Sequence, residues 1–201
     1  MKSRIDMGSV RIIAGQWRSR RLAFPAVAQL RPTANRVRET LFNWLQNDVE
    51  QEDCLDLFAG TGACGLEALS RGARHVTFVE QNRRVADAII ANLKMLGASE
   101  KPVICSEAVT WLNQNHQISA QKFGIVFMDP PYADELEQTC CEALESSGLL
   151  KNRALIYLES NRNLQDSLFP SAWRVLKKNR AGVVFYWLFE RTSRGAEISD
   201  E

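Results

Sequence analysis

The chain has 201 residues, of which 45% are hydrophobic and 24% are charged, and its formal net charge is +1. These values are typical of a globular protein with a hydrophobic core and argue against a disordered chain. No apolar run reaches the roughly 18 residues that cross a bilayer, and the first residues do not resemble a secretory signal, so we expect a cytoplasmic protein with no membrane partner.

The first part of the chain is strongly basic. Residues 1–45 carry nine basic and two acidic side chains, a net charge of +7, which leaves −6 on the remaining 156 residues. This asymmetry favours a local surface for polyanions, although a solvated charged segment has the same composition. We expect three segments: a basic extension over residues 1–32, a main domain over 33–192 and a polar tail over 193–201.

The first predicted elements precede the main domain's sheet. Residues 10–24 hold two short apolar runs around a glycine-containing turn, which predicts a small hairpin. Thr33 is expected to cap a helix along which Val37, Leu41 and Trp44 recur at helical spacing.

From residue 53 onward, short apolar runs alternate with segments of helical length. This alternation predicts an α/β fold with a mainly parallel sheet and helices on both faces. Two further runs near the end predict an antiparallel hairpin at one edge, which brings the sheet to seven strands. The predicted strands are 54–58, 75–80, 102–106, 124–129, 154–159, 173–178 and 183–189. The predicted helices are 64–71, 82–96, 107–115 and 133–147.

A glycine-rich loop follows the first of these strands. Residues 56–65, DLFAGTGACG, place Gly60, Gly62 and Gly65 in a G-x-G-x-x-G pattern between a strand and a helix. Glu80 ends the next strand about 20 residues later, where a carboxylate can accept hydrogen bonds from a ribose. The pattern predicts a nucleoside cofactor but does not separate a dinucleotide from S-adenosylmethionine. Asp56 favours the latter, because its carboxylate would repel a pyrophosphate.

A second motif, GIVFMDPPY, covers residues 124–132. The buried strand stops at Asp129 because Pro130 and Pro131 have no backbone donor. Asp129 and the Pro130 carbonyl can hold the two N–H bonds of an exocyclic amine, and Tyr132 can stack on its base. The motif therefore predicts methylation of an amino group, with a strand-terminating turn as the structural alternative.

Together FAGTG, DPPY and the preceding LRPTANRVRETLFNWL resemble the RsmD family, small bacterial methyltransferases that make N2-methylguanine in small-subunit ribosomal RNA. The resemblance runs from RIIAGQWRSRRL to the closing hairpin. It implies a Rossmann-like class I methyltransferase with S-adenosylmethionine as cofactor and Asp129, Pro130, Pro131 and Tyr132 as the catalytic motif. Glu107 takes the place of an acidic residue that contacts the adenine, where the family more often has Asp. The implied cofactor-binding residues are Thr33, Arg36, Asp56, Phe58, Ala59, Gly60, Thr61, Gly62, Glu80, Glu107 and Ala108.

The N-terminal segment also carries candidates for RNA binding. Trp17, Arg18, Arg20 and Arg21 interleave an aromatic ring with cations, which suits stacking and phosphate contacts. The alternative is a core anchor at Trp17 beside solvated arginines. We expect a monomer that acts on ribosomal RNA within an assembled or assembling small subunit.

Three other functions remain open from the sequence. A DNA adenine-N6 methyltransferase would use the same DPPY chemistry, although 201 residues leave little room for a sequence-reading domain. A nicotinamide-dependent oxidoreductase would share the glycine pattern, but neither His75 nor His116 lies in a hydride-transfer motif. A non-enzymatic RNA-binding protein is the third. The five cysteines form no C-x-x-C pair, so we predict reduced thiols and no metal site.

Overall fold

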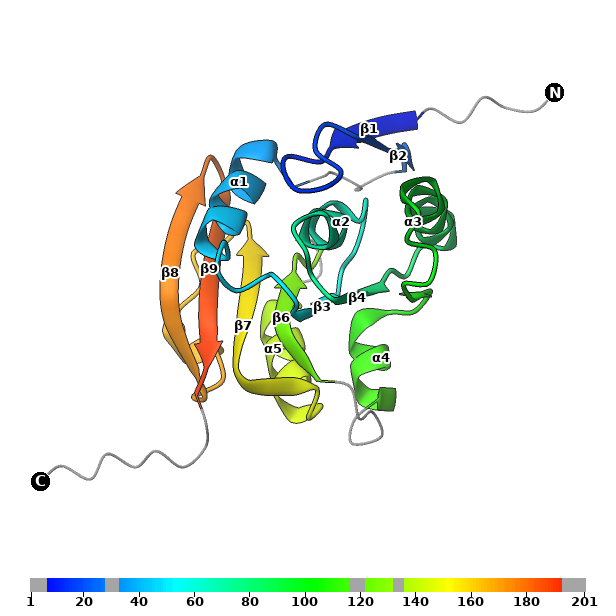
Figure 1. The fold of residues 1–201 in the computed structure, drawn as a ribbon. Coiled ribbons are helices and arrows are strands. Elements are labelled where there is room, and N and C mark those ends of the chain that lie inside the picture. The colour runs from blue at the N-terminus through cyan, green and yellow to red at the C-terminus, as the bar shows by residue number, and fades with distance from the viewer. Residues whose placement is uncertain (1–6, 28–32, 116–121, 132–135, 193–201) are drawn as a thin grey trace, which may run out of the picture.

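The computed structural model describes residues 7–27, 33–115, 122–131 and 136–192. A seven-stranded sheet with the order β5-β4-β3-β6-β7-β9-β8 runs through the molecule (Figure 1). Its strands are β3 (Asp53–Asp56), β4 (His75–Val79), β5 (Val103–Ile104), β6 (Phe123–Met128), β7 (Leu150–Ser160), β8 (Trp173–Ala181) and β9 (Val184–Arg191).

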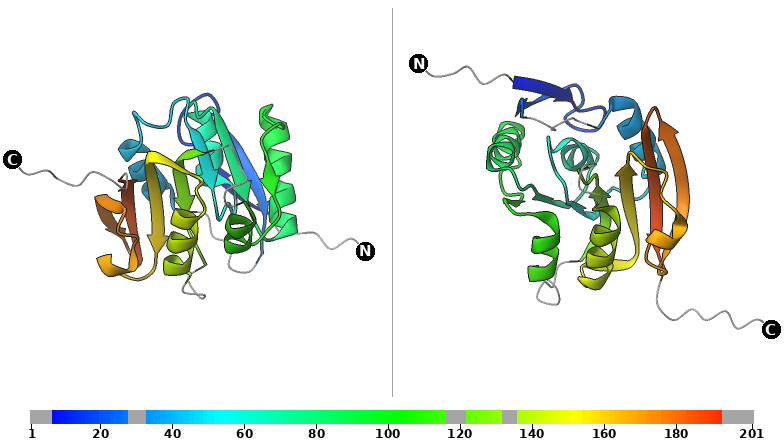
Figure 2. Two further views of the ribbon diagram at one scale, coloured as in Figure 1. Left: turned by 90° about the horizontal axis from the view of Figure 1, so that it is seen from below. Right: turned by 180° about the vertical axis from the view of Figure 1, so that it is seen from behind.

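The helices divide between the two faces of this sheet (Figure 2). Apolar side chains of α1, α2 and α3 pack in one core cluster, and those of α4 and α5 pack in a second cluster on the other face. The helices are α1 (Asn35–Trp44), α2 (Ala63–Ser70), α3 (Arg83–Leu96), α4 (Ala108–Asn115), α5 (Glu137–Ser146) and the short 3-10 helix η1 (Asp166–Leu168).

Strands β3 to β7 pair in parallel, whereas β9 lies antiparallel between β7 and β8. All six residues of β6 are buried, because a parallel strand covered on both faces has no solvent side. The carboxyl ends of β3, β4, β6 and β7 therefore meet at one edge of the sheet. The predicted fold class, including the antiparallel hairpin at the end of the chain, is confirmed.

Some predicted element boundaries were wrong. The strand expected over residues 102–106 contains only Val103 and Ile104, since it lies at the sheet edge and begins after a proline. Thr33 is not the N-cap of the first helix; Ala34 occupies that position and makes no side-chain cap bond. The expected helix over 133–147 is described only from Glu137 to Ser146.

The predicted N-terminal hairpin is present as β1 (Met7–Arg11) and β2 (Arg21–Pro25). Its connecting segment is attached to α2 by partly buried hydrogen bonds. The Glu67 carboxylate accepts hydrogen bonds from the backbone N–H groups of Ile13 (2.7 Å) and Ala14 (2.9 Å). Ser70 accepts one from the N–H of Trp17 at 3.0 Å. The hairpin therefore rests on the helix that begins at the glycine loop.

All five cysteines are free thiols; four of them are buried and Cys105 is exposed. Within the described ranges, no helix is both long enough and apolar enough to cross a membrane.

Candidate active site

The glycine loop joins β3 to α2 at the carboxyl edge of the sheet. Gly60 and Gly62 have φ angles of +50° and +73°, a region that side-chain-bearing residues rarely adopt. Gly65 serves a different purpose: a Cβ there would lie 2.3 Å from the Phe78 ring and 3.0 Å from Asp56 Oδ2. The first two glycines permit the sharp turn, and the third permits close packing of α2 against β4.

Two carboxylates hold this loop in place. Asp56 Oδ2 accepts a hydrogen bond from the N–H of Gly65 at 2.8 Å. Glu80 Oε2 accepts one from the N–H of Gly60 at 2.8 Å, and its Oε1 accepts another from Asn82 at 2.7 Å. Burial raises the pKa of Asp56 to about 7, against the effect of its Gly65 hydrogen bond. Glu80 is only partly buried, so its remaining lone pairs can still accept hydrogen bonds from a ligand.

Asp129 follows β6 at the same edge. It is partly exposed, and Pro130 behind it is buried. The register pairs Met128 of β6 with Leu158 of β7, so Asp129 and Glu159 occupy equivalent positions on neighbouring strands. Burial raises the pKa of Asp129 well above its usual value, and the nearby carboxyl of Glu159 adds to this effect. Tyr132, the last residue of the predicted catalytic motif, lies outside the described residues.

Glu159 and Tyr157 are site residues that the sequence analysis missed. The Tyr157 hydroxyl donates to Glu159 Oε1 at 2.7 Å, and burial raises the pKa of Glu159 to about 7 despite this bond. The Thr33 side chain acts to lower the pKa of both Glu159 and Asp129, against the larger effect of burial. One signal was available: Glu159 ends a predicted buried strand, as Glu80 and Asp129 do.

A cavity of about 40 Å³ connects these elements. Because it is far smaller than a nucleoside, it can enclose only the reacting end of such a ligand. Asp129 and Tyr157 line it on the side of β6 and β7. Of the residues predicted to hold the cofactor, it is lined by Thr33, Asp56, Phe58, Ala59, Gly60 and Thr61.

The other predicted cofactor residues lie outside this cavity. Glu107 caps α4: its two oxygens accept hydrogen bonds from the N–H groups of Val109 (2.9 Å) and Thr110 (2.7 Å). Partial burial acts to raise the pKa of Glu107, but these hydrogen bonds lower it below its usual value. Ala108 is the buried first residue of that helix, and Arg36 is exposed in the first turn of α1.

The predicted RNA-binding residues lie around the N-terminal hairpin. Trp17 is half-buried and packs against the core cluster, as its core-anchor alternative predicts. Arg18, Arg20 and Arg21 are exposed, and Arg21 lies directly opposite Arg11, which the sequence analysis had not selected. The described residues contain no group of three or more His, Cys, Asp or Glu side chains that could hold a metal ion.

A glycine loop and an Asp-Pro-Pro segment at the carboxyl edge of this sheet define a Rossmann-like class I methyltransferase. A family model described as "Conserved hypothetical protein 95" matches residues 10–190. "Ribosomal RNA small subunit methyltransferase D" of Escherichia coli K12 is 42% identical over 193 residues, 96% of each chain. The chain therefore belongs to this family, the RsmD family, as its motifs predicted.

Two further comparisons agree. "Ribosomal RNA small subunit methyltransferase D" of Haemophilus influenzae is 41% identical over 185 residues, which are 91% of this chain and 94% of that protein. The solved structure titled "Putative methyltransferase yhhF from Escherichia coli" has a TM-score of 0.82 and 43% sequence identity. That match covers 93% of this chain and all of the other, so the two proteins share the whole fold.

Proposed function

We propose that the chain transfers a methyl group from S-adenosylmethionine to the exocyclic N2 amino group of a guanine in small-subunit ribosomal RNA. The observation that carries this proposal is the position of Asp129. It lies across a small cavity from the glycine loop, at the carboxyl edge where open α/β sheets bind their ligands. The names of the relatives indicate the class of substrate, which is small-subunit ribosomal RNA.

The charges of the site fit a cationic cofactor. The N–H groups of Gly60 and Gly65 already donate to Glu80 and Asp56, so the loop does not present these donors to a pyrophosphate. Four carboxyls, those of Asp56, Glu80, Asp129 and Glu159, lie at this edge of the sheet. S-adenosylmethionine carries a sulfonium and an ammonium group, and these cations favour the ionised form of such carboxyls, whereas the pyrophosphate of a dinucleotide would disfavour it. When bound, it supplies an electrophilic methyl group.

The residues at the end of β6 orient the amine. The lone pair of an exocyclic amine is delocalised into its base, so the amine is a weak nucleophile. Asp129 and the Pro130 carbonyl accept its two N–H bonds and direct the nitrogen toward the methyl group. The two prolines fix the backbone between these acceptors. Asp129 or solvent takes the surplus proton after transfer, and Tyr132 supplies a stacking surface for the base.

Other parts of the chain position the two ligands. Glu80 binds the ribose, and Thr33 with Arg36 meets the methionine carboxylate. Glu107 and Ala108 border the adenine. Arg18, Arg20 and Arg21 bind RNA phosphates, with the exposed part of Trp17 beside them. We place the reaction in the cytoplasm, with a monomer acting on a small subunit that presents the base.

Replacing Asp129 tests this assignment. Asp129→Ala removes one of the two acceptors, and we expect methyl transfer to fall by at least about 100-fold. The affinity for S-adenosylmethionine, measured by calorimetry, should change by less than about threefold. Asp87→Ala, an exposed carboxylate on α3, is the control and should keep full activity. Wild-type turnover in Asp129→Ala would rule out this mechanism.

A further inference from the structure

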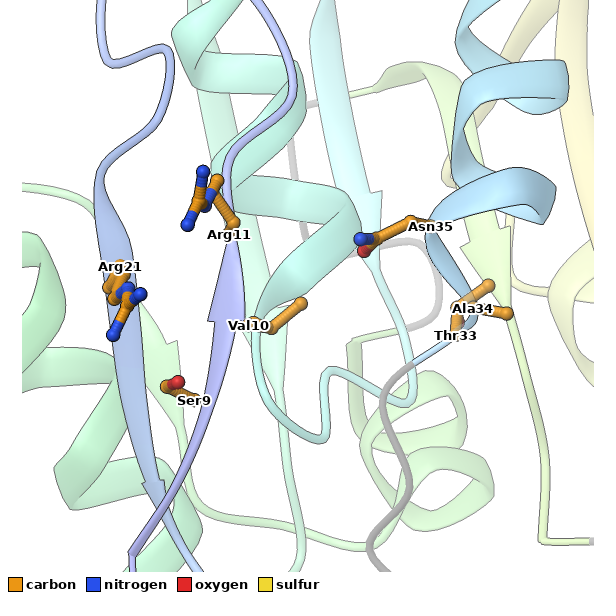
Figure 3. A pocket seen from close by; sticks show the side chains of 7 residues that line it. All are labelled: Ser9, Val10, Arg11, Arg21, Thr33, Ala34 and Asn35. Atoms are coloured by element: carbon orange, nitrogen blue, oxygen red, sulfur yellow. The ribbon is translucent and has the colours of Figure 1, made fainter.

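A second and larger cavity lies between the N-terminal hairpin and the start of α1 (Figure 3). Its volume is about 390 Å³. Thr33 lines both this cavity and the one at the glycine loop, so the two are neighbours. The other lining residues are Ser9, Val10, Arg11, Arg21, Ala34 and Asn35.

Two arginines give this cavity its charge. Arg11 of β1 and Arg21 of β2 are directly opposite each other in the antiparallel register, so their side chains leave the hairpin on the same face. Both are exposed, and none of the described residues forms an ion pair with either of them. None of the described residues that line the cavity is acidic. Like charges at opposite positions destabilise a hairpin, so this pair is not explained by folding stability.

A buried arginine joins the two walls of the cavity. Arg38 is fully buried, and its Nη2 donates to the backbone oxygen of Arg11 (2.9 Å) and to Asn35 Oδ1 (2.7 Å). The second bond fixes the Asn35 amide with its Nδ2 as the group left to donate, and this side chain points from α1 toward β1 (Figure 3). Arg38 therefore links β1 to α1 beside the cavity and fixes the orientation of the Asn35 donor.

We propose that this cavity binds a backbone phosphodiester of the substrate RNA, beside the nucleotide that enters the active site. Arginine pairs hold phosphate oxygens with short, charge-assisted hydrogen bonds, and Asn35 adds a neutral donor. The first turn of α1 adds to the attraction, because it has neither an acidic residue nor a side-chain cap. A phosphate held beside Thr33 fixes the RNA backbone next to Asp129, which is how phosphate contacts position a base without reading its sequence.

This inference rests on the proposed function, and one other anion competes for the site: the methionine carboxylate of the cofactor. The test uses Arg11→Gln, Arg21→Gln and the double variant. Lys94→Gln on α3 is the control, because Lys94 is exposed and lies in the last turn of the helix, away from the carboxyl edge. Affinities for unmodified small subunits, for their stripped RNA and for S-adenosylmethionine are measured over a series of KCl concentrations.

The double variant is expected to bind both RNA forms about tenfold more weakly than the wild type. The slope of log affinity against log salt should fall by about 1, and the affinity for S-adenosylmethionine should stay the same. Arg11→Lys with Arg21→Lys keeps the charges and should keep most of the slope. The control should leave all three affinities and the slope unchanged.

Each contrary outcome has a distinct meaning. Unchanged RNA affinity and salt slope in the double variant would overturn the inference, and so would a slope change that Lys94→Gln reproduces. Weaker cofactor binding with unchanged RNA binding would assign the cavity to the methionine carboxylate. If the wild type binds RNA through these arginines but methylates no ribosomal nucleoside, the proposed function fails while the phosphate site remains.

Discussion

Glu67 anchors the N-terminal hairpin to the helix that follows the glycine loop, and its removal gives a sharp prediction. The side chain is fully buried. Its carboxylate accepts hydrogen bonds from Ile13 N (2.7 Å), Ala14 N (2.9 Å) and Arg71 Nε (2.8 Å). It also lies 3.6 Å from Nη1 of the fully buried Arg38.

Glu67→Ala leaves two backbone donors and the Arg71 Nε donor without their acceptor, and it removes the carboxylate that is ion-paired with the buried Arg38 guanidinium. Loss of one partner of a buried ion pair costs about 3–5 kcal/mol, and each unsatisfied donor adds up to about 1–3 kcal/mol where water cannot replace the acceptor. Because Ile13 and Ala14 are partly exposed, water replaces part of that loss, and we expect the free energy of unfolding to fall by about 4 kcal/mol. Glu67→Gln keeps one acceptor oxygen and should cost less.

Urea unfolding followed by circular dichroism measures this change. Glu142→Ala is the matched control, an exposed glutamate on α5 that should stay within about 0.5 kcal/mol of the wild type. Amide hydrogen exchange supplies a local readout, since Ile13 and Ala14 should lose protection in Glu67→Ala while strand β6 keeps it. A loss below about 1 kcal/mol with unchanged protection would refute this role of Glu67.

Two further predictions concern a turn and the buried carboxyls. Gly15→Ala should lower the free energy of unfolding in urea by at least about 2 kcal/mol more than Gly97→Ala does. Both glycines have positive φ, but a Cβ at Gly15 would lie 1.8 Å from the backbone oxygen of Ser70, whereas nothing lies within 4 Å of a Cβ at Gly97. Equal losses would contradict this reading. Burial raises the folded-state pKa values of Asp56 and Glu159 to about 7. Their protonated forms therefore stabilise the ligand-free protein below the unfolded-state pKa of about 4. This stability is lost as the pH rises through 7. The melting temperature of Glu159→Gln should therefore fall less between pH 4 and 7 than that of the wild type; parallel curves would show that Glu159 does not titrate in this range.

The motifs and the sheet were predictable because their signals are local in sequence. The glycine loop, Glu80 and Asp129 each end or follow a strand, and parallel strands bring such ends to one edge. The same reasoning placed the closing hairpin, whose two apolar runs flank a glycine with φ of +62°. Strand limits were less predictable, since β5 is shortened by its edge position rather than by its composition.

Contacts between distant segments were not predictable. Glu159 lies beside Asp129 because of the register between β6 and β7, and a single sequence does not specify that register. Glu67 contacts residues more than 50 positions earlier, and its sequence neighbourhood reads as an ordinary helix. Thr33 looked like a helix cap because of its position, but Ala34 is the N-cap, and Thr33 lines the cavity that also contains Asp129. The role proposed for Arg11 depends on its position directly opposite Arg21 on the neighbouring strand, which the sequence alone does not specify.

The most direct test of the central claim is transfer of labelled methyl from S-adenosylmethionine to unmodified small ribosomal subunits and to their stripped RNA, with nucleoside analysis of the product. Duplex DNA serves as the third substrate. We predict N2-methylguanosine as the labelled nucleoside, with the subunit as the preferred form. Label in N6-methyladenine of DNA, or no incorporation into any substrate by a protein that binds the cofactor, would contradict the proposed function.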